Sequence, residues 1–166
     1  MRVYVDATTL ISLGSIGELG LLTNFDGEPV VLPAVRDEVT TEPARTNVER
    51  LVERGELDTG DSTYKEHIEK AIEVLEEGEE NGDVQVVAAV LGREEAGVVS
   101  DDRRVRTVCD GLGATVTGTV GVVVRAVEEG MSEEQAKEVV HRVDEHGLHM
   151  TAELRETAYN LIERRA

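Results

Sequence analysis

Residues 1–13 read MRVYVDATTLISL, and the rest of the chain is organised around this stretch. Within it, Val3 and Val5 form a short apolar alternation around Tyr4, and all three residues favour β-strands. Asp6 ends that run, and apolar residues then recur at helical spacing. The pattern predicts a strand over 2–5 that passes through an acidic residue into a helix over 7–14.

Two interpretations of Asp6 follow from this position. In α/β proteins, a carboxylate at the carboxyl end of a strand lies where active sites are built. Alternatively, the residue only caps the helix that follows it. Taken alone, the pattern favours the cap. Acidic residues at matching places elsewhere in the chain would favour the active site.

The remaining sequence alternates strands with helices. Three more strands are expected, at about 30–32, 97–100 and 114–117. Helices are expected at 7–14, 17–23, 33–40, 44–54, 63–77, 82–93, 103–112, 119–130, 132–145 and 151–164. This alternation predicts a parallel sheet with helices on both faces, and 166 residues suit a single domain.

The charge of the chain is unusual. It holds 35 acidic against 17 basic residues, for a formal net charge of −18, and its only lysines are Lys65, Lys70 and Lys137. The apolar periodicity is intact, so we do not expect disorder. The composition resembles that of proteins from salt-loving archaea, in which the Debye length of about 3 Å at 1 M salt screens such charge. At low salt the same charge would oppose nucleic-acid binding.

Cysteine usage and hydropathy predict a cytoplasmic protein. The single Cys109 excludes a disulfide within the chain and suits a reducing compartment. No apolar run has the length needed to span a membrane, so no membrane association is expected. His141, His146 and His149 lack the spacing of a zinc site and are interpreted as surface or packing residues.

Acidic residues stand at several junctions between the expected elements. Asp6 follows the first strand, Asp101 and Asp102 follow the third, Glu38 lies in the helix after the second, and Asp83 begins a buried helix. Carboxylates held together repel one another unless a cation neutralises them. Oxygen ligands suit Mg²⁺ or Mn²⁺, which can activate water for phosphoryl displacement. Acids are common in this chain, so spacing alone only suggests such a cluster.

Several blocks of sequence together resemble a PIN domain, most closely the short prokaryotic group related to VapC toxins. The blocks are VYVDATTLISLGSIGELGLL, VLPAVRDEV, GDVQVVAAVLG and GVVSDDRRVRTVCDGLGATVTGTVGVVVRAVEEG, in the family's order from residue 2 to about 130. Residues 131–166 resemble the helical pair that ends the family's chains. The resemblance implies a single PIN-like domain over 1–166, with a three-layer α/β/α fold. Its parallel sheet would have four or five strands, with the first strand central.

The resemblance also implies a metal-dependent ribonuclease with an acidic pocket. Asp6 matches the family's first acid, Glu38 the acid of VxxEV, Asp83 the acid after the glycine that opens the buried helix, and Asp102 the acid of the serine/threonine-x-Asp signature. These four are the implied catalytic residues. Asp6, Asp83 and Asp102 would hold Mg²⁺ or Mn²⁺, with Asp101 as an alternative ligand. Glu38 would orient or deprotonate the attacking water.

The substrate contacts implied by the resemblance are hydroxyl and arginine side chains. Thr8 and Ser100 match the family's hydroxyl residues, and Thr8 could also hold the helix start while the acid before it faces the ion. Arg103, Arg104 and Arg106 follow the metal acids and are expected to contact phosphate. Arg104 and Arg106 could equally be solvated residues of a helix face.

Two positions depart from the family pattern. Gln85 stands where many relatives carry a second acid, and Arg104 stands where a further acid can occur. The second metal position is therefore in doubt, and the site could hold one ion or two.

Three functions remain open at this stage. The first is an endoribonuclease acting on RNA, as the toxin half of a toxin–antitoxin pair, with an antitoxin protein as partner and pairing into a homodimer. The second is a catalytically weak PIN-like module that binds RNA or a protein, an alternative kept open by Gln85 and the acidic surface. The third, a phosphatase or receiver-like domain, would usually need a lysine near a later strand, and the fourth-strand region has none.

Overall fold

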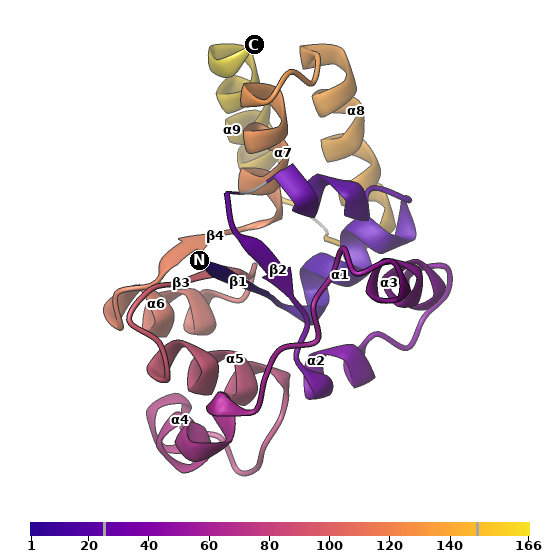
Figure 1. Ribbon diagram of the computed structural model, residues 1–166. Helices are drawn as coiled ribbons and strands as arrows, with labels where there is room; N and C mark the ends of the chain where they lie inside the picture. Colours follow the sequence, from indigo (N-terminus) through magenta and orange to yellow (C-terminus); the bar gives the residue numbers. More distant parts are fainter. Residues whose placement is uncertain (25, 149) are drawn as a thin grey trace.

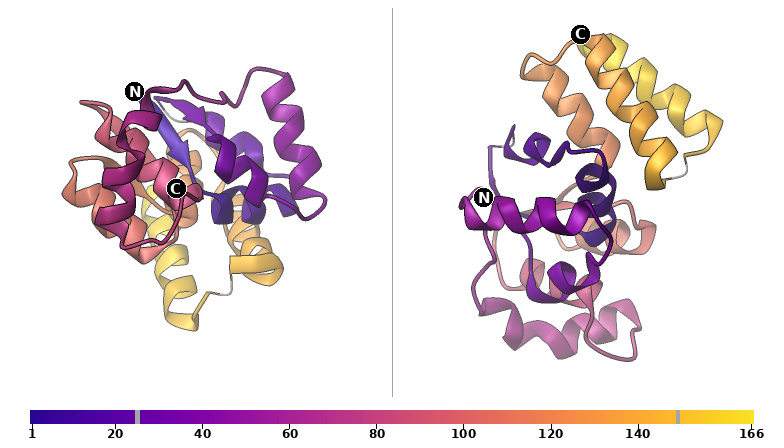
Figure 2. Two further views of the ribbon diagram at one scale, coloured as in Figure 1. Left: turned by 90° about the horizontal axis from the view of Figure 1, so that it is seen from below. Right: turned by 90° about the vertical axis from the view of Figure 1, so that its right-hand side faces the viewer.

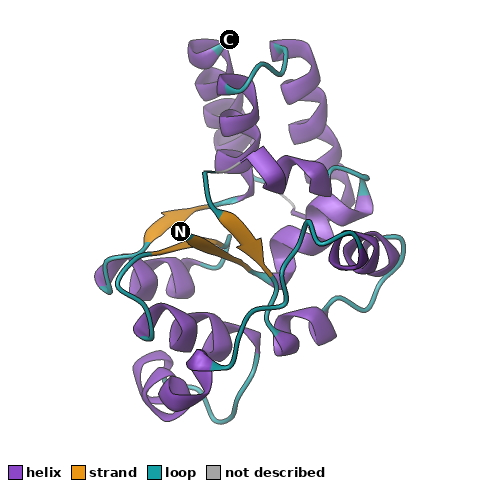
Figure 3. Cartoon of the chain, in the orientation of Figure 1, coloured by secondary structure: helices purple, strands orange, loops and turns teal. Residues whose placement is uncertain are grey.

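A computed structural model describes residues 1–24, 26–148 and 150–166 of the chain, so His149 lies outside the described residues. Its centre is a parallel four-stranded sheet in the order β2–β1–β3–β4 (Figures 1 and 3). The strands are β1 (Arg2–Val5), β2 (Glu28–Val30), β3 (Ala96–Val99) and β4 (Thr115–Thr117). The predicted parallel sheet with a central first strand is confirmed.

Helices lie on both faces of this sheet. The α-helices are α1 (Ala7–Ser15), α2 (Pro33–Glu38), α3 (Ala44–Glu53), α4 (Ile68–Leu75), α5 (Gly82–Leu91), α6 (Arg103–Gly111), α7 (Thr119–Glu128), α8 (Glu133–Val143) and α9 (Ala152–Arg165). Short 3₁₀ segments, η1 (Leu19–Asn24) and η2 (Thr63–His67), and a π-helical turn, η3 (Asp144–Leu148), connect them. In Figure 1, α4, α5 and α6 lie below the sheet and α7, α8 and α9 above it. The expected three-layer α/β/α fold is therefore confirmed.

The core is built mainly from Val, Leu, Ile and Ala. All four residues of β3 are buried, as expected for a strand of a parallel sheet covered on both faces. Helix α5 is also buried almost all round, because it packs against β1, β3, η2 and α4. The apolar sequence of this helix predicted that burial.

Several predicted elements differ in the structure, and the helix expected over 17–23 is the 3₁₀ segment η1. The second strand spans Glu28–Val30 instead of 30–32, because Val31 turns to bond Asp58 O at 2.8 Å and Leu32 is already the N-cap of α2. The helix expected over 63–77 is a 3₁₀ turn followed by α4. Helix α4 ends where Glu76 adopts a left-handed φ of 56°.

The carboxyl-terminal helices form an antiparallel pair beside α7. Figure 2 shows α8 and α9 side by side and projecting away from the sheet, and both helices contact α7. Helix α8 begins with the capping box that was predicted, Ser132 with Gln135. Within the described residues, no helix combines the length and the hydropathy needed to cross a membrane.

Candidate active site

Asp6 lies at the carboxyl end of β1 and is also the N-cap of α1. Its Oδ1 accepts a hydrogen bond from Ala7 N at 2.8 Å, and its Oδ2 accepts one from Ser100 Oγ at 2.7 Å. Burial raises the pKa of Asp6, the two hydrogen bonds oppose that rise, and the charges of Asp102 and Asp101 add to it. The structure confirms that Asp6 caps α1, and its role in an active site stays a prediction. The expectation that Thr8 holds the helix start is wrong.

Ser100 joins the first and third strands of the sheet behind the acids. Its side chain is fully buried, donates to Asp6 Oδ2, and accepts a hydrogen bond from Asp102 N at 3.1 Å. We expected Ser100 among the substrate contacts. Its burial instead fits a residue that positions two carboxylates.

The two acids after β3 have different surroundings. Asp102 is the N-cap of α6, and its Oδ1 accepts a hydrogen bond from Val105 N at 3.0 Å. Asp101 turns toward α7, where Oδ1 accepts a bond from Thr119 N at 2.9 Å and Oδ2 accepts one from Thr119 Oγ1. As a metal ligand, Asp101 would have to share an oxygen with Thr119.

Thr119 is a site residue that sequence reasoning missed. Its hydroxyl also lies 3.0 Å from Thr9 Oγ1, and both side chains are buried. The preceding Gly118 leaves space for this arrangement, since a Cβ there would lie 2.7 Å from Asp101 Oδ1 and 2.5 Å from an Arg106 nitrogen. The Gly-Thr pair between β4 and α7 was the available signal, because a strand-to-helix turn is where a hydroxyl meets the neighbouring strand end.

Glu38 lies in α2 and Asp83 lies in α5. In Figure 1 both helices lie below the sheet, whereas α7 lies above it. Glu38 is the last residue of α2, and its Oε1 accepts a hydrogen bond from Gly82 N at 2.9 Å at the start of α5. A Cβ at Gly82 would lie 2.5 Å from Glu38 Oε2, so glycine is needed for this close contact. Asp83 follows in the first turn of α5, whose N-cap Asn81 accepts a bond from Val84 N.

The electrostatics of Asp83 show that these carboxylates lie near one another. Its pKa is raised to about 6, first by burial and then by the negative charges of Asp6, Asp102 and Glu38, while Arg104 lowers it. Asp83 is therefore close enough to Asp6, Asp102 and Glu38 for their charges to act on it. A cation bound next to such a carboxyl group would stabilise its ionised form and offset the repulsion from the neighbouring acids.

The donor chemistry of this cluster fits a hard divalent cation. Among the described residues, no group of three or more His, Cys, Asp or Glu side chains is placed to hold a metal ion directly. Mg²⁺ commonly keeps several waters and takes only one or two protein carboxylates, so it does not require three direct ligands. Asp6, Asp83 and Asp102 are the residues that would hold it, directly or through water.

Gln85 stands at the position where the resemblance predicts a second acid, and its side chain makes two hydrogen bonds there. Its buried side chain accepts a hydrogen bond from Ala34 N at 2.8 Å and donates one to Glu80 Oε2 at 2.6 Å. The amide thus links the start of α2 to the loop before α5. A carboxylate could not make the second bond, because it has no proton to donate at neutral pH.

The three arginines of α6 differ in their contacts. Arg103 is exposed at the first residue of the helix. Arg104 pairs with Glu77, bonds Leu75 O at 3.0 Å, and lies 3.8 Å from Asp83 Oδ2. Arg106 donates a long bond of 3.4 Å to Ser100 O. Thr8, the other expected substrate contact, is exposed in the first turn of α1.

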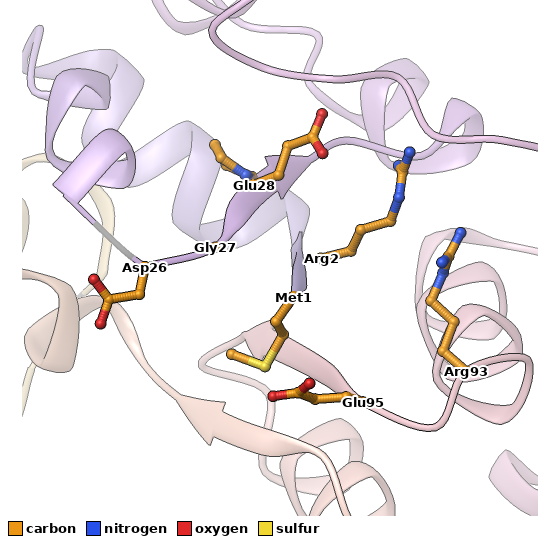
Figure 4. A pocket seen from close by; sticks show the side chains of 8 residues that line it. Met1, Arg2, Asp26, Gly27, Glu28, Arg93 and Glu95 are labelled. Carbon is orange, nitrogen blue, oxygen red and sulfur yellow. The ribbon is translucent and has the colours of Figure 1, made fainter.

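A separate hollow of about 560 Å³ lies at the opposite end of the strands (Figure 4). Arg2 and Arg93 extend to the same side of it, as Figure 4 shows. Both cations already have acidic partners, since Arg2 lies 3.3 Å from Asp58 and Arg93 lies 2.5 Å from Asp61. This hollow therefore offers little free positive charge to a phosphate.

Comparison with known proteins gives one match. A family model described as a PIN domain matches residues 2–164, which is nearly the whole chain. No curated protein and no solved structure shows significant similarity to the chain.

Proposed function

Because the chain belongs to the PIN-domain family, whose members are generally nucleases that use divalent metal ions, we propose that it is a metal-dependent endoribonuclease that hydrolyses phosphodiester bonds in RNA. The observation that carries this proposal is the hydrogen-bonded link from Asp6 through Ser100 to Asp102 at the carboxyl ends of β1 and β3, together with the raised pKa of Asp83, on which the charges of Asp6, Asp102 and Glu38 act.

The residues of the cluster have separate roles in this proposal. A bound Mg²⁺ or Mn²⁺ would supply Lewis-acid stabilisation of charge on the scissile phosphate. Asp6, Asp83 and Asp102 would hold the cation, and Ser100 donates a hydrogen bond that positions Asp6. Glu38 keeps one oxygen on Gly82 N and uses the other to orient or deprotonate the attacking water.

The arginines of α6 are the proposed phosphate contacts. Arg103 is exposed next to the metal acid Asp102, and Arg106 reaches the end of β3 from the next turn of the helix. Arg103 directly follows Asp102 in sequence and Arg106 lies three residues further along the helix, so an RNA backbone reaching the cluster would pass close to both.

The direct test is cleavage of a structured RNA by protein stripped of metal with a chelator. We expect no cleavage until Mg²⁺ or Mn²⁺ is restored, and a loss of about 10²-fold or more in Glu38→Gln, as is typical when a general base is removed. Asp37→Asn is the matched control, because Asp37 is an exposed acid on the same helix. Equal cleavage with and without metal would contradict the proposal.

A second function has specific support in the contacts of Arg104 and Gln85. The first places a positive charge beside Asp83, and the second fills the position of another acid with an amide that is already hydrogen-bonded. Both features suit a catalytically weak module that binds RNA or a protein. A wild-type protein that shows neither metal-dependent thermal stabilisation nor cleavage would favour this second function.

The biological setting that we propose is the toxin half of a toxin–antitoxin pair, with an antitoxin that covers the acidic pocket and a homodimer as the assembled state. A small reading frame beside the gene, whose product co-purifies with this chain and blocks cleavage, would support that role. Gel filtration coupled to light scattering measures the oligomeric state. A functional nuclease with no such neighbour and no inhibitor would argue for a role outside toxin–antitoxin systems.

A further inference from the structure

A cavity of about 470 Å³ lies where the carboxyl end of β4 meets α6, α7 and α9, and we call it the Arg106 cavity. Its size is within the range of about 300–1,000 Å³ that pockets for small organic groups commonly have. It adjoins the acidic cluster through Ser100, whose backbone O accepts a bond from Arg106 and whose side chain donates to Asp6. The residues of the lining that matter here are Asp101, Arg106, Gly118, Val120, Leu154 and Leu161.

Arg106 brings unused hydrogen-bond donors to this cavity. Within the part of the chain that the structure describes, its guanidinium pairs with no carboxylate and donates only the long bond of 3.4 Å to Ser100 O. A guanidinium is a planar fork with several N–H donors and no acceptor. The exposed side chain can therefore present two neighbouring N–H groups to a ligand that carries two neighbouring acceptors.

Asp101 brings acceptors to the same cavity. Thr119 donates to both of its carboxylate oxygens, from N at 2.9 Å and from Oγ1. Each carboxylate oxygen has two lone pairs, so Asp101 can accept further bonds while Thr119 fixes its orientation. Because Asp101 lines the cavity, the remaining lone pairs are available to a ligand with two neighbouring donors.

Gly118 leaves open the space between these two groups. A Cβ at this position would lie 2.5 Å from Arg106 Nη1 and 2.7 Å from Asp101 Oδ1, so both charged groups border one point above the Gly118 Cα. The backbone here has a φ of −110°, which any residue adopts, so glycine is needed for space and not for its conformation. A ligand that enters meets the donor fork and the carboxylate side by side.

Apolar side chains of α7 and α9 complete the lining. Val120 and Leu161 are partly buried against the core, whereas Leu154 is 44% exposed. A flat organic group that packs against Leu154 would remove apolar surface from water, which is favourable. The Arg106 cavity therefore suits a ligand with apolar faces and a polar edge.

Among the bases of RNA, guanine matches this set of groups most fully. It carries two neighbouring acceptors, N7 and O6, which arginine binds in a bidentate manner, and two neighbouring donors, N1–H and N2–H, which suit a carboxylate. O6 lies next to N1 on the ring, as the two contacts must if both protein groups border one point. Adenine has an amino group in place of O6 and no proton on N1. Proteins commonly read unpaired RNA bases on these edges.

We propose that the Arg106 cavity binds a guanine base of the RNA next to the scissile phosphate. Arg106 donates to N7 and O6, Asp101 accepts from N1 and N2, and Leu154 packs against the face of the ring. The inference rests on the proposed function, since the base belongs to the RNA substrate. It gives Arg106 a base contact beside the phosphate contact proposed above, and it gives Asp101 a role other than metal binding.

The test titrates isotope-labelled, metal-free protein with 5′-GMP, in about 1 M sodium chloride with a chelator, and follows the backbone amides by two-dimensional NMR. We expect saturable shifts at Gly118, Val120 and Gly121, which line the cavity. The dissociation constant for 5′-GMP should be at least about fivefold lower than those for 5′-AMP, 5′-CMP and 5′-UMP, since a bidentate contact discriminates between bases by that factor or more. The four nucleotides carry the same phosphate, so repulsion by the acidic protein cancels in this comparison.

Two analogues test the two contacts separately on the wild-type protein. The nucleotide 5′-IMP lacks the N2 amino group that Asp101 would accept from, and 7-deaza-5′-GMP lacks the N7 atom that Arg106 would donate to. Each analogue is expected to bind about threefold to tenfold more weakly than 5′-GMP, as is typical when one hydrogen bond is lost.

Arg106→Met removes the donor fork and keeps the length of the side chain, so it should bind 5′-GMP no more tightly than 5′-AMP. Gly118→Ala fills the point that both charged groups border and should weaken 5′-GMP at least about fivefold. Arg164→Met is the matched control, because it removes an exposed arginine of α9 that does not line the cavity, and its preference for 5′-GMP should be unchanged. The NMR spectrum of each free variant shows whether the fold is kept. If a variant unfolds, the analogue titrations of the wild type decide the question.

A guanine preference that Arg106→Met abolishes and Arg164→Met keeps supports the inference, whether or not RNA is cleaved. Equal affinities for the four nucleotides, a preference for another base, shifts that lie away from the cavity, or no binding of 5′-GMP would each overturn the guanine site. Those results would leave the nuclease proposal standing, because its own test is metal-dependent cleavage.

Discussion

At the scale of single residues, the buried hydroxyl of Ser100 positions two acids of the candidate site. Ser100 Oγ donates a hydrogen bond to the Asp6 carboxylate and accepts one from Asp102 N. This one hydroxyl therefore connects the carboxyl ends of β1 and β3. The sequence placed this serine in the family's signature but could not show that it lies behind the acids. The distinction depends on burial, which the spacing of residues does not reveal.

Ser100→Ala tests this positioning role. The change leaves Asp102 N and one Asp6 oxygen without the buried partner, so we expect a loss of about 1–3 kcal/mol in the free energy of unfolding. Mn²⁺ affinity should fall as well. Urea denaturation and metal titration measure the two effects. Ser62→Ala is the control, because the Ser62 side chain does not cap the helical turn that follows it.

The raised pKa of Asp83 predicts a dependence of stability on pH in the metal-free protein. A carboxyl group whose folded pKa is about 6, against an ordinary 3.8, favours folding fully below 3.8 and loses that contribution as the pH rises through 6. Asp83→Asn removes the group. The variant should therefore become more stable than the wild type as the pH rises from 4 to 7, by about 2 kcal/mol at the end of that range.

Urea denaturation at a series of pH values gives this difference directly. Asp110→Asn serves as the control, since Asp110 is an exposed acid of α6 and its removal should give a difference that stays flat. A flat difference for Asp83→Asn would mean that neither burial nor the neighbouring carboxylates raise the pKa of Asp83.

At the scale of elements, the link between α2 and α5 determines where Glu38 and Asp83 lie. Gln85 holds the start of α2 through Ala34 N, and Glu38 at the end of α2 holds the start of α5 through Gly82 N. Each helix is thus bonded to the other near both ends of α2, which has only six residues. Helices this short have little stability of their own, so these bonds fix the place of Glu38.

Gln85→Glu is expected to loosen this link. The new carboxylate would face Glu80 in place of a donated bond of 2.6 Å, and we expect a loss of about 2 kcal/mol in the free energy of unfolding. Glu80→Gln in the same chain should restore most of that loss, because it returns a donor to the pair. Thermal or chemical denaturation of the two single variants and the double variant measures the coupling. Purely additive effects would show that the two side chains do not interact.

The sequence predicted the elements of the site better than the connections between them. The strand–acid–helix pattern at Asp6 and the helix opened by Gly82 and Asp83 were confirmed, because apolar periodicity and capping are local. The shift of β2 to Glu28–Val30 was not predictable, since Val31 and Leu32 are buried outside the sheet and look like strand residues. The bonds of Asp101 to Thr119 join residues 18 positions apart, beyond the reach of any local pattern.

At the scale of the whole molecule, the net charge of −18 is expected to make the stability of the protein depend on salt. Many of the acids lie on the surface without adding to the core, so their mutual repulsion opposes folding when little salt is present. A nuclease with this surface must also approach a polyanion. Concentrated salt weakens both repulsions, because it shortens the distance over which exposed charges interact.

We therefore expect the melting temperature to rise with potassium chloride, by at least about 5 °C between 0.1 and 2 M, as screening removes the repulsion. Calorimetry or dye-based melting gives the values. Potassium glutamate at the same concentrations shows whether the anion matters. A melting temperature that falls or stays constant with salt would mean that the acidic surface does not limit stability.

We propose that the acids around Asp6 bind a divalent ion and cleave RNA. The most direct measurement compares single-turnover cleavage of a structured RNA by the wild type and by Asp6→Asn, at equal Mn²⁺ and high salt, with both proteins shown to be folded. Asparagine keeps the N-cap of α1, so the fold should persist. We predict metal-dependent cleavage by the wild type and a loss of at least about 10³-fold in the variant. Equal rates in the two proteins would contradict the claim.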